Sequence, residues 1–88
     1  MPQRNQLRAL RVALGLTQEG LALRAHISRV EVVGLEGGRY AGRSVRMRDG
    51  LAGAVGIEPA DMARFLAGGL SLAEVLALRD EKSKAEVA

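Results

Sequence analysis

Arginine is the side chain with the most evident chemistry in this sequence. Residues 1–48 carry nine Arg and three Glu, a net charge of +6, whereas residues 49–88 carry four basic and seven acidic side chains, a net charge of −3. Guanidinium groups donate paired hydrogen bonds that match phosphate oxygens and the edge of guanine. A basic half of this kind is typical of a surface that meets a phosphate backbone, but a solvated, Arg-rich face has the same composition.

Other kinds of chemistry have little support. There is no cysteine and His26 is the single histidine, which excludes disulfides, thiolate metal sites and histidine-cluster metal sites. No nucleophile with a neighbouring base, no pair of carboxylates and no glycine-rich phosphate loop can be assembled. Tyr40 and Phe65 are the two aromatic residues, too few to stack the bases of a single strand. We therefore expect neither an enzyme nor a bound cofactor or metal ion.

Length and hydropathy favour one small domain away from membranes. A chain of 88 residues suffices for one modest core. No apolar run approaches the length of a membrane span, and no signal-peptide pattern is present. We expect a cytoplasmic protein that does not contact a membrane.

Two short helices joined by a tight turn are predicted around the middle of the basic half. Thr17 can cap a helix over residues 18–25, and Ser28 with Glu31 forms an S-x-x-E capping box for a second helix over residues 28–36. Because only His26 and Ile27 separate them, the two helices must cross steeply and share a small core. His26 is expected at a positive φ, which histidine tolerates.

Apolar spacing predicts four more helices, over residues 5–14, 44–55 and 59–67 and from Ser71 to about residue 79. In the helix over 44–55, we expect Val45 to face the core with Leu51, Ala52 and Val55, and Met47 to fill a gap, whereas Gly50 and Gly53 lower its helix propensity.

The residues that carry a family resemblance extend through most of the chain. They are Leu7, Leu10, Gly15, Leu16, Thr17, Gln18, Glu19, Leu21, Ala22, Ile27, Ser28, Val32, Leu35, Glu36, Gly38, Ala52, Ala54, Val55, Gly56 and Ile57. In type and spacing they resemble the helix-turn-helix regulators of the lambda-repressor/Cro (xenobiotic-response-element) family. The resemblance implies an all-α, compact five- to six-helix domain over residues 4–68, with the helix-turn-helix at its second and third helices. Residues 69–79 would add a C-terminal helix, and residues 80–88 a charged flexible tail.

The resemblance also implies a function and a set of site residues. It implies a transcriptional regulator, commonly a repressor, that binds double-stranded DNA sequence-specifically as a homodimer, with the third helix in the major groove. The base-contacting residues would be Ser28, Arg29, Val30, Val33 and Gly34. The DNA backbone would be held by Gln18, Arg39, Tyr40 and Arg43.

Several roles stay open. Glu31 either folds back as the capping partner of Ser28 or faces the groove, while Glu36 is interpreted as a structural hydrogen-bonding group. One or two of Arg4, Arg8 and Arg11 either approach a phosphate, or all three are solvated. Leu72, Val75 and Leu76 either pair with a second copy of the chain or seal the domain.

A protein-binding module of the same fold, such as an antitoxin or anti-regulator, is the alternative function. The exposed valines Val30 and Val33 and the acidic Glu31 suit such a surface. DNA binding controlled by a regulatory protein partner would combine both functions.

Overall fold

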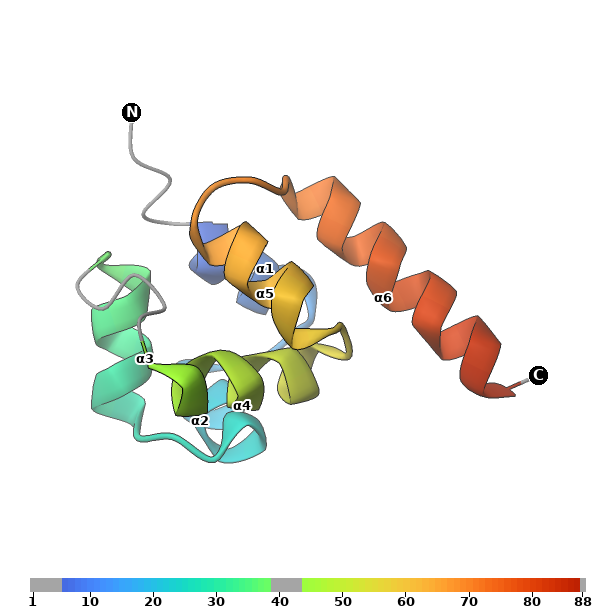
Figure 1. Ribbon diagram of the computed structural model, residues 1–88. Coiled ribbons are helices and arrows are strands. Elements are labelled where there is room, and N and C mark those ends of the chain that lie inside the picture. Colours follow the sequence, from blue (N-terminus) through green and yellow to red (C-terminus); the bar gives the residue numbers. More distant parts are fainter. Residues whose placement is uncertain (1–5, 39–43, 88) are drawn as a thin grey trace.

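Six helices follow one another in the part of the chain that the structure describes. The computed structural model describes residues 6–38 and 44–87, and no strand occurs within these ranges. The helices are α1 (Gln6–Ala13), α2 (Gln18–Ala25), α3 (Arg29–Glu36), α4 (Val45–Val55), α5 (Pro59–Leu66) and α6 (Leu72–Val87) (Figure 1). The prediction of an all-α fold with five or six helices is confirmed.

The ends of α2 and α3 follow from their capping residues. The Thr17 hydroxyl accepts a hydrogen bond from the Gly20 N–H at 2.9 Å. His26 ends α2 in the left-handed conformation, with φ 57° and ψ 40°. The Ser28 hydroxyl accepts from the Glu31 N–H at 3.1 Å, and a Glu31 carboxylate oxygen accepts from the Ser28 N–H at 2.9 Å. Each bond satisfies a backbone group that a helix end leaves without a partner, so the predicted caps account for both helices.

One hydrophobic core joins the helices. Its members come from every helix and from the connections after α2, α4 and α5. They are Leu7, Leu10, Leu21, Ala22, Ala25, Ile27, Val32, Leu35, Met47, Leu51, Ala52, Val55, Ile57, Met62, Phe65, Leu70 and Val75. Val45 is not among them, because its side chain is 59% exposed and the prediction that it faces the core is wrong. Met47 lies two residues further, about 200° around the helix, and occupies the inner face instead.

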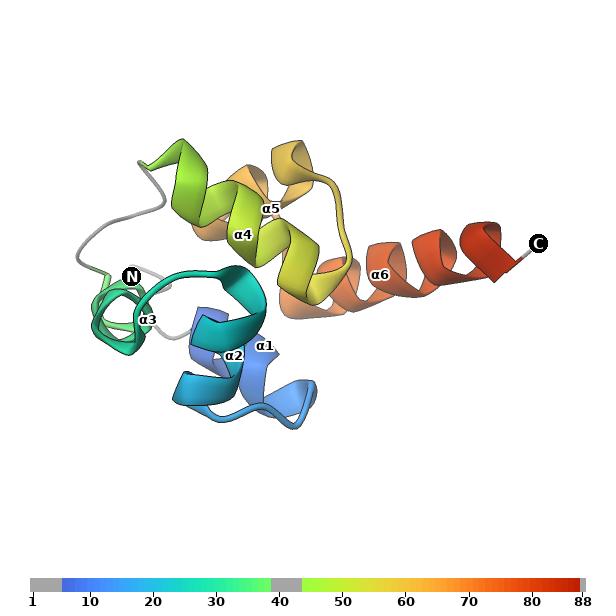
Figure 2. The same cartoon turned by 90° about the horizontal axis from the view of Figure 1, so that it is seen from below.

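Helix α4 approaches α2 closely enough to require a glycine. Figures 1 and 2 show the two helices side by side. A Cβ atom on Gly50 would lie 2.1 Å from the Ala25 carbonyl oxygen, a distance that no side chain can occupy. Gly50 therefore permits the contact between the two helices, whereas Gly53 has open space around the same position.

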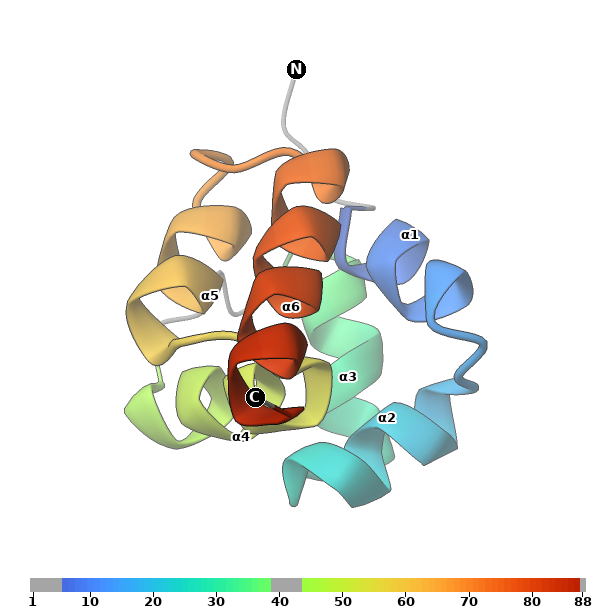
Figure 3. The same cartoon turned by 90° about the vertical axis from the view of Figure 1, so that its right-hand side faces the viewer.

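Helix α6 lies across α1 and α5 and then leaves the body of the molecule. Its first half packs between these two helices (Figure 3), where Val75 is fully buried. Its second half projects outward (Figures 1 and 2). The helix that was predicted to end near residue 79 extends to Val87, so residues 80–87, expected to form a charged tail, are helical. Residues of high helix propensity fill this stretch, and Lys82 and Lys84 lie 3.4 Å from carboxylate oxygens of Glu58 and Asp80.

Arg79 ties α6 to the end of α4. Its Nε donates to the Val55 carbonyl oxygen at 3.0 Å. That carbonyl belongs to the last turn of α4, where backbone oxygens lack helical partners and a cation is favoured.

None of the six helices, over the residues that the structure describes, combines the length and apolar character needed to cross a membrane.

Candidate functional site

The outer face of α3 exposes most of the residues predicted to contact bases. Ser28 and Arg29 are exposed, and the side chains of Val30 and Val33 are 68% and 37% exposed. Helix α3 forms one edge of the molecule (Figure 1), with Val32 and Leu35 turned into the core. The helix therefore presents a cation and two valines on a face that the rest of the described chain leaves open.

Gly34 does not belong to this face. It is buried, so the prediction that it faces outward among the base-contacting residues is wrong. A glycine has no side chain with which to reach beyond the surrounding turns of its helix. The surface of α3 available to a partner is therefore centred on Arg29, Val30 and Val33.

Glu31 is held at the start of α3 by two neighbours. One carboxylate oxygen accepts from the Ser28 N–H, and the other accepts from Nη2 of Arg46 on α4. The hydrogen bond from the Ser28 N–H, with a further contribution from Arg46, keeps the pKa of Glu31 below its ordinary value of 4.5. The capping role expected for Glu31 is thus confirmed. No local pattern could reveal its pairing with Arg46, which lies 15 residues away.

The far end of α3 is held by a second ion pair, which is mostly buried. Arg11 Nε lies 2.6 Å from Glu36 Oε2, and the two side chains are only 12% and 7% exposed. Arg11 Nη1 also donates to the Leu16 carbonyl oxygen at 2.9 Å. The structural role of Glu36 is confirmed, and both alternatives considered for Arg11, a phosphate contact and a solvated face, are wrong.

Gln18 belongs to the same network. Its side-chain Nε2 donates to Glu36 Oε1 at 3.2 Å. Gln18 is also the first residue of α2, where backbone N–H groups without helical partners attract anions. Its amide group therefore links the start of α2 to the end of α3, and the backbone N–H groups beside it stay compatible with the predicted phosphate contact.

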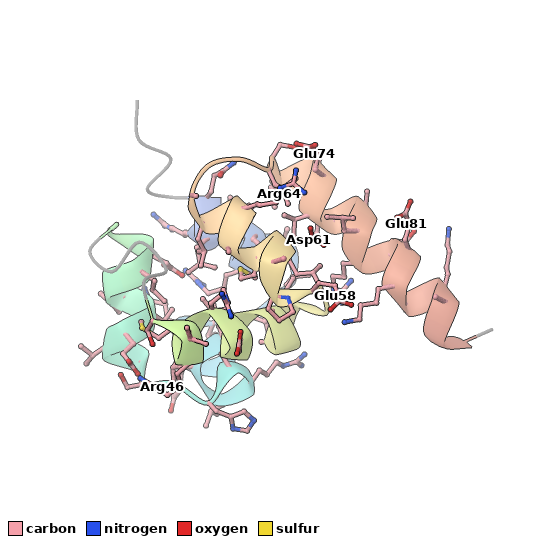
Figure 4. The ribbon with its side chains drawn as sticks, in the orientation of Figure 1. Arg46, Glu58, Asp61, Arg64, Glu74 and Glu81 are labelled. Carbon is pink, nitrogen blue, oxygen red and sulfur yellow. The ribbon has the colours of Figure 1, made fainter. Side chains whose placement is uncertain are left out.

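Further arginines of the basic half are exposed on other helices. Arg8, Arg24 and Arg46 are exposed on α1, α2 and α4. Arg39, Tyr40 and Arg43, which were predicted to hold the DNA backbone, lie outside the described residues. Figure 4 shows four acidic side chains away from Arg46, with Arg64 among them: Glu58 just before α5, Asp61 on α5, and Glu74 and Glu81 on α6. These four carboxylates of the acidic half therefore lie apart from the junction that Arg46 occupies.

No metal site emerges from the part of the chain that the structure describes. It contains no group of three or more His, Cys, Asp or Glu side chains that could hold an ion. His26 is exposed at the turn between α2 and α3, where its backbone conformation ends α2.

Leu72, Val75 and Leu76, the residues considered for a dimer contact, pack against the chain's own core. Val75 is completely buried, whereas Leu72 and Leu76 are partly buried at the edge of the core. A contact between Val75 and a second copy would require α6 to leave its place. The packing favours the alternative in which α6 seals the domain.

Comparison of the chain with protein-family models, curated proteins and solved structures found no match. The resemblance to the lambda-repressor/Cro family therefore rests on the residues quoted above. What it implies about function is argued below as a proposal.

Proposed function

We propose that this chain is a transcriptional regulator that binds double-stranded DNA sequence-specifically, as the lambda-repressor/Cro resemblance implies. The observation that carries the proposal is the exposure of Arg29, Val30 and Val33 on one short helix whose opposite face is buried and whose two ends are held by arginines of α1 and α4. A helix fixed in this way can enter the major groove without first becoming ordered, which lowers the entropy lost on binding.

The exposed residues of α3 suit the edges of bases. In the proposed complex, the guanidinium of Arg29 donates to O6 and N7 of a guanine, the most common specific contact in the major groove. Val30 and Val33 contact thymine methyl groups. The Ser28 hydroxyl, which already caps α3, can accept or donate a further hydrogen bond at the groove.

Contacts with the phosphates would set the orientation of α3. The positive end of α2 at Gln18 supplies backbone N–H groups for one phosphate. The segment carrying Arg39, Tyr40 and Arg43, assigned from the sequence alone, supplies others. As a homodimer, the protein would span two half-sites about 34 Å apart on a two-fold operator, and it would repress by excluding polymerase.

Selection from random-sequence duplex DNA tests this function. The expected result is a two-fold consensus bound about 10³-fold or more tightly than bulk DNA at physiological salt. Weak, unselective binding that is lost as salt approaches the physiological concentration would contradict it, since such binding requires only a generic basic surface.

A protein-binding module of the same fold is a second candidate, supported by the exposure of its valines. Val30 and Val33 on α3 are 68% and 37% exposed, and a protein partner covering this face would remove both apolar side chains from water. The variants Val30→Ala/Val33→Ala and Arg29→Ala distinguish the two functions. If the partner is a protein, the valine variant should lose it and Arg29→Ala should largely keep it. If the partner is DNA, Arg29→Ala should weaken binding most, and the valine variant should lose only the apolar contacts with thymine methyl groups.

A further inference from the structure

Arg46 occupies the point where three helices meet. It lies in the first turn of α4, and its Nη2 contacts Glu31 Oε2 at the start of α3. Its Nη1 lies 3.5 Å from the carbonyl oxygen of His26, the residue that ends α2. Figure 4 shows Arg46 at this junction. A single guanidinium thus bridges both sides of the turn between α2 and α3.

The bridge leaves no oxygen of Glu31 without a partner. The Ser28 N–H occupies one carboxylate oxygen and Arg46 the other. The carboxylate cannot turn toward the outer face of α3 unless both bonds break, and its side chain is only 23% exposed although it lies on a surface helix. The carboxylate therefore accepts within the protein and is not available to a base.

The charge balance at this end of α3 depends on Arg46. Arg29 supplies one positive charge and Glu31 one negative charge in the first turn of the helix, so these two residues alone cancel. With Arg46 paired to Glu31, the positive charge of Arg29 is no longer opposed. A carboxylate without this partner would repel the phosphates on both sides of a groove.

We propose that Arg46 is a positioning residue that holds Glu31 against the start of α3 and neutralises it, which makes an acidic residue compatible with a DNA-reading helix. The proposal rests on the proposed function. Arg46 acts through Glu31, and its own contact with DNA is not required. This role differs from that of an arginine that only adds positive charge to the surface.

A double-mutant cycle in the full chain tests the proposal. The variants are Arg46→Gln, Glu31→Gln and the combination of both, measured by equilibrium binding to a duplex selected by the wild-type protein. Glu31→Gln retains an oxygen for the Ser28 N–H, because glutamine also serves in a capping box. Arg64→Gln is the matched control: Arg64 is 61% exposed and lies 3.6 Å from Asp61, so the variant also removes one charge from a surface ion pair, but on α5.

Arg46→Gln should weaken binding roughly threefold to tenfold, whereas Arg64→Gln should not. In the double variant, binding should return to within about twofold of the wild type, since the unbalanced carboxylate is gone. An equal loss in Arg46→Gln and in the double variant would show that Arg46 itself contacts a phosphate, and would overturn the proposal. Unchanged binding by Arg46→Gln would overturn it as well.

Titration of the Glu31 carboxyl by carbon-13 NMR in the free protein adds a readout that does not depend on DNA. The pKa of Glu31 should rise in Arg46→Gln and stay unchanged in Arg64→Gln. The same pKa in wild type and Arg46→Gln would overturn the contact itself. A wild-type protein that binds no duplex selectively would overturn the proposed function and the DNA role of Arg46 together, so that failure is distinct from failure of the cycle.

Discussion

Gly50 illustrates how one missing side chain sets the position of a helix. Its backbone lies against the carbonyl of Ala25, and α4 could not reach α2 if a methyl group stood between them. The sequence suggested only that Gly50 weakens α4. The reason for the glycine is a contact between residues 25 positions apart, and such a contact leaves no local pattern to read.

Gly50→Ala should destabilise the protein by about 1–3 kcal/mol, even though alanine is the better helix former by about 1 kcal/mol. Gly53→Ala is the control on the same helix, because nothing lies within 4 Å of its added Cβ. That variant should gain about 0.4–1 kcal/mol. Urea denaturation of the two variants measures both changes, and equal stability of the pair would contradict the close approach of α2 and α4.

Arg29 is the residue on which specificity is expected to depend most. Arg29→Ala should lose about 1–3 kcal/mol of binding free energy and relax the preference at one base position. Binding to a panel of duplexes with single substitutions measures the effect. A loss of the same size on every duplex would assign Arg29 to a phosphate and not to a base.

Among the elements, α3 shows most clearly which structural features local sequence patterns can predict and which they cannot. Its limits, its cap at Ser28 and its inward residues were predictable, because capping boxes and helical periodicity involve residues only a few positions apart. The arginines that hold its two ends come from α1 and α4, and only the folded chain brings them there. The buried position of Gly34 was missed because periodicity describes where side chains point, and glycine has none.

The ion pair at the end of α3 should contribute strongly to stability. Glu36→Gln leaves the mostly buried guanidinium of Arg11 without its counter-charge, so we expect a loss of about 3 kcal/mol or more. Lys84→Gln breaks a pair with Asp80 in which both side chains are more than two-thirds exposed, and should change stability by about 0.5 kcal/mol or less. Denaturation by guanidinium chloride measures the free energy of unfolding of both variants. A similarly small change in the stability of both variants would contradict this expectation, since it would mean that water solvates the Arg11 guanidinium once residue 36 is neutral.

Helix α6 begins with a capping box formed by Ser71 and Glu74, in which the pKa of Glu74 is lowered. The Ser71 N–H donates to Glu74 at 2.9 Å and, with the Ser71 hydroxyl, keeps the pKa of Glu74 below 4.5. A pKa that is lower in the folded than in the unfolded chain adds stability above the unfolded value, and this stability is lost as pH falls through the folded value.

Glu74→Gln should therefore be less stable than the wild type near neutral pH. The difference should shrink as pH falls below about 4.5 and vanish once pH is below the pKa of Glu74 in the folded chain. Urea denaturation over a series of pH values measures it. Parallel stability curves for the two proteins would show that the contact of Glu74 with Ser71 contributes nothing to folding.

The end of α6 was predictable only in part. The apolar stripe of Leu72, Val75 and Leu76 indicated the start of the helix but ended near residue 79, and the charged residues after it resembled a tail. Their high helix propensity, together with the bonds from Arg79 and Lys82 to the body of the domain, extends the helix to Val87. The stripe suited a dimer interface as well as a core, and the burial of Val75 favours the core.

At the scale of the whole molecule, the helix with the exposed face and most of the positive charge belong to the same half of the chain. Helix α3 belongs to the basic half of the chain, and Glu58, Asp61, Glu74 and Glu81 lie away from it (Figure 4). This polarity would steer α3 toward a polyanion and keep α5 and α6 in solvent. The core, the helix order and the exposed face of α3 followed from the sequence, whereas the pairing of charges across helices did not.

The central claim is that the exposed face of α3 is the surface that meets DNA. NMR titration of the labelled protein with its selected duplex tests it most directly, because every backbone amide reports separately. We expect the largest shift changes at Arg29, Val30 and Val33 and at the start of α2, with α5 and α6 nearly unchanged. Changes centred on α5 and α6, or small changes spread evenly over all exposed arginines, would contradict the claim.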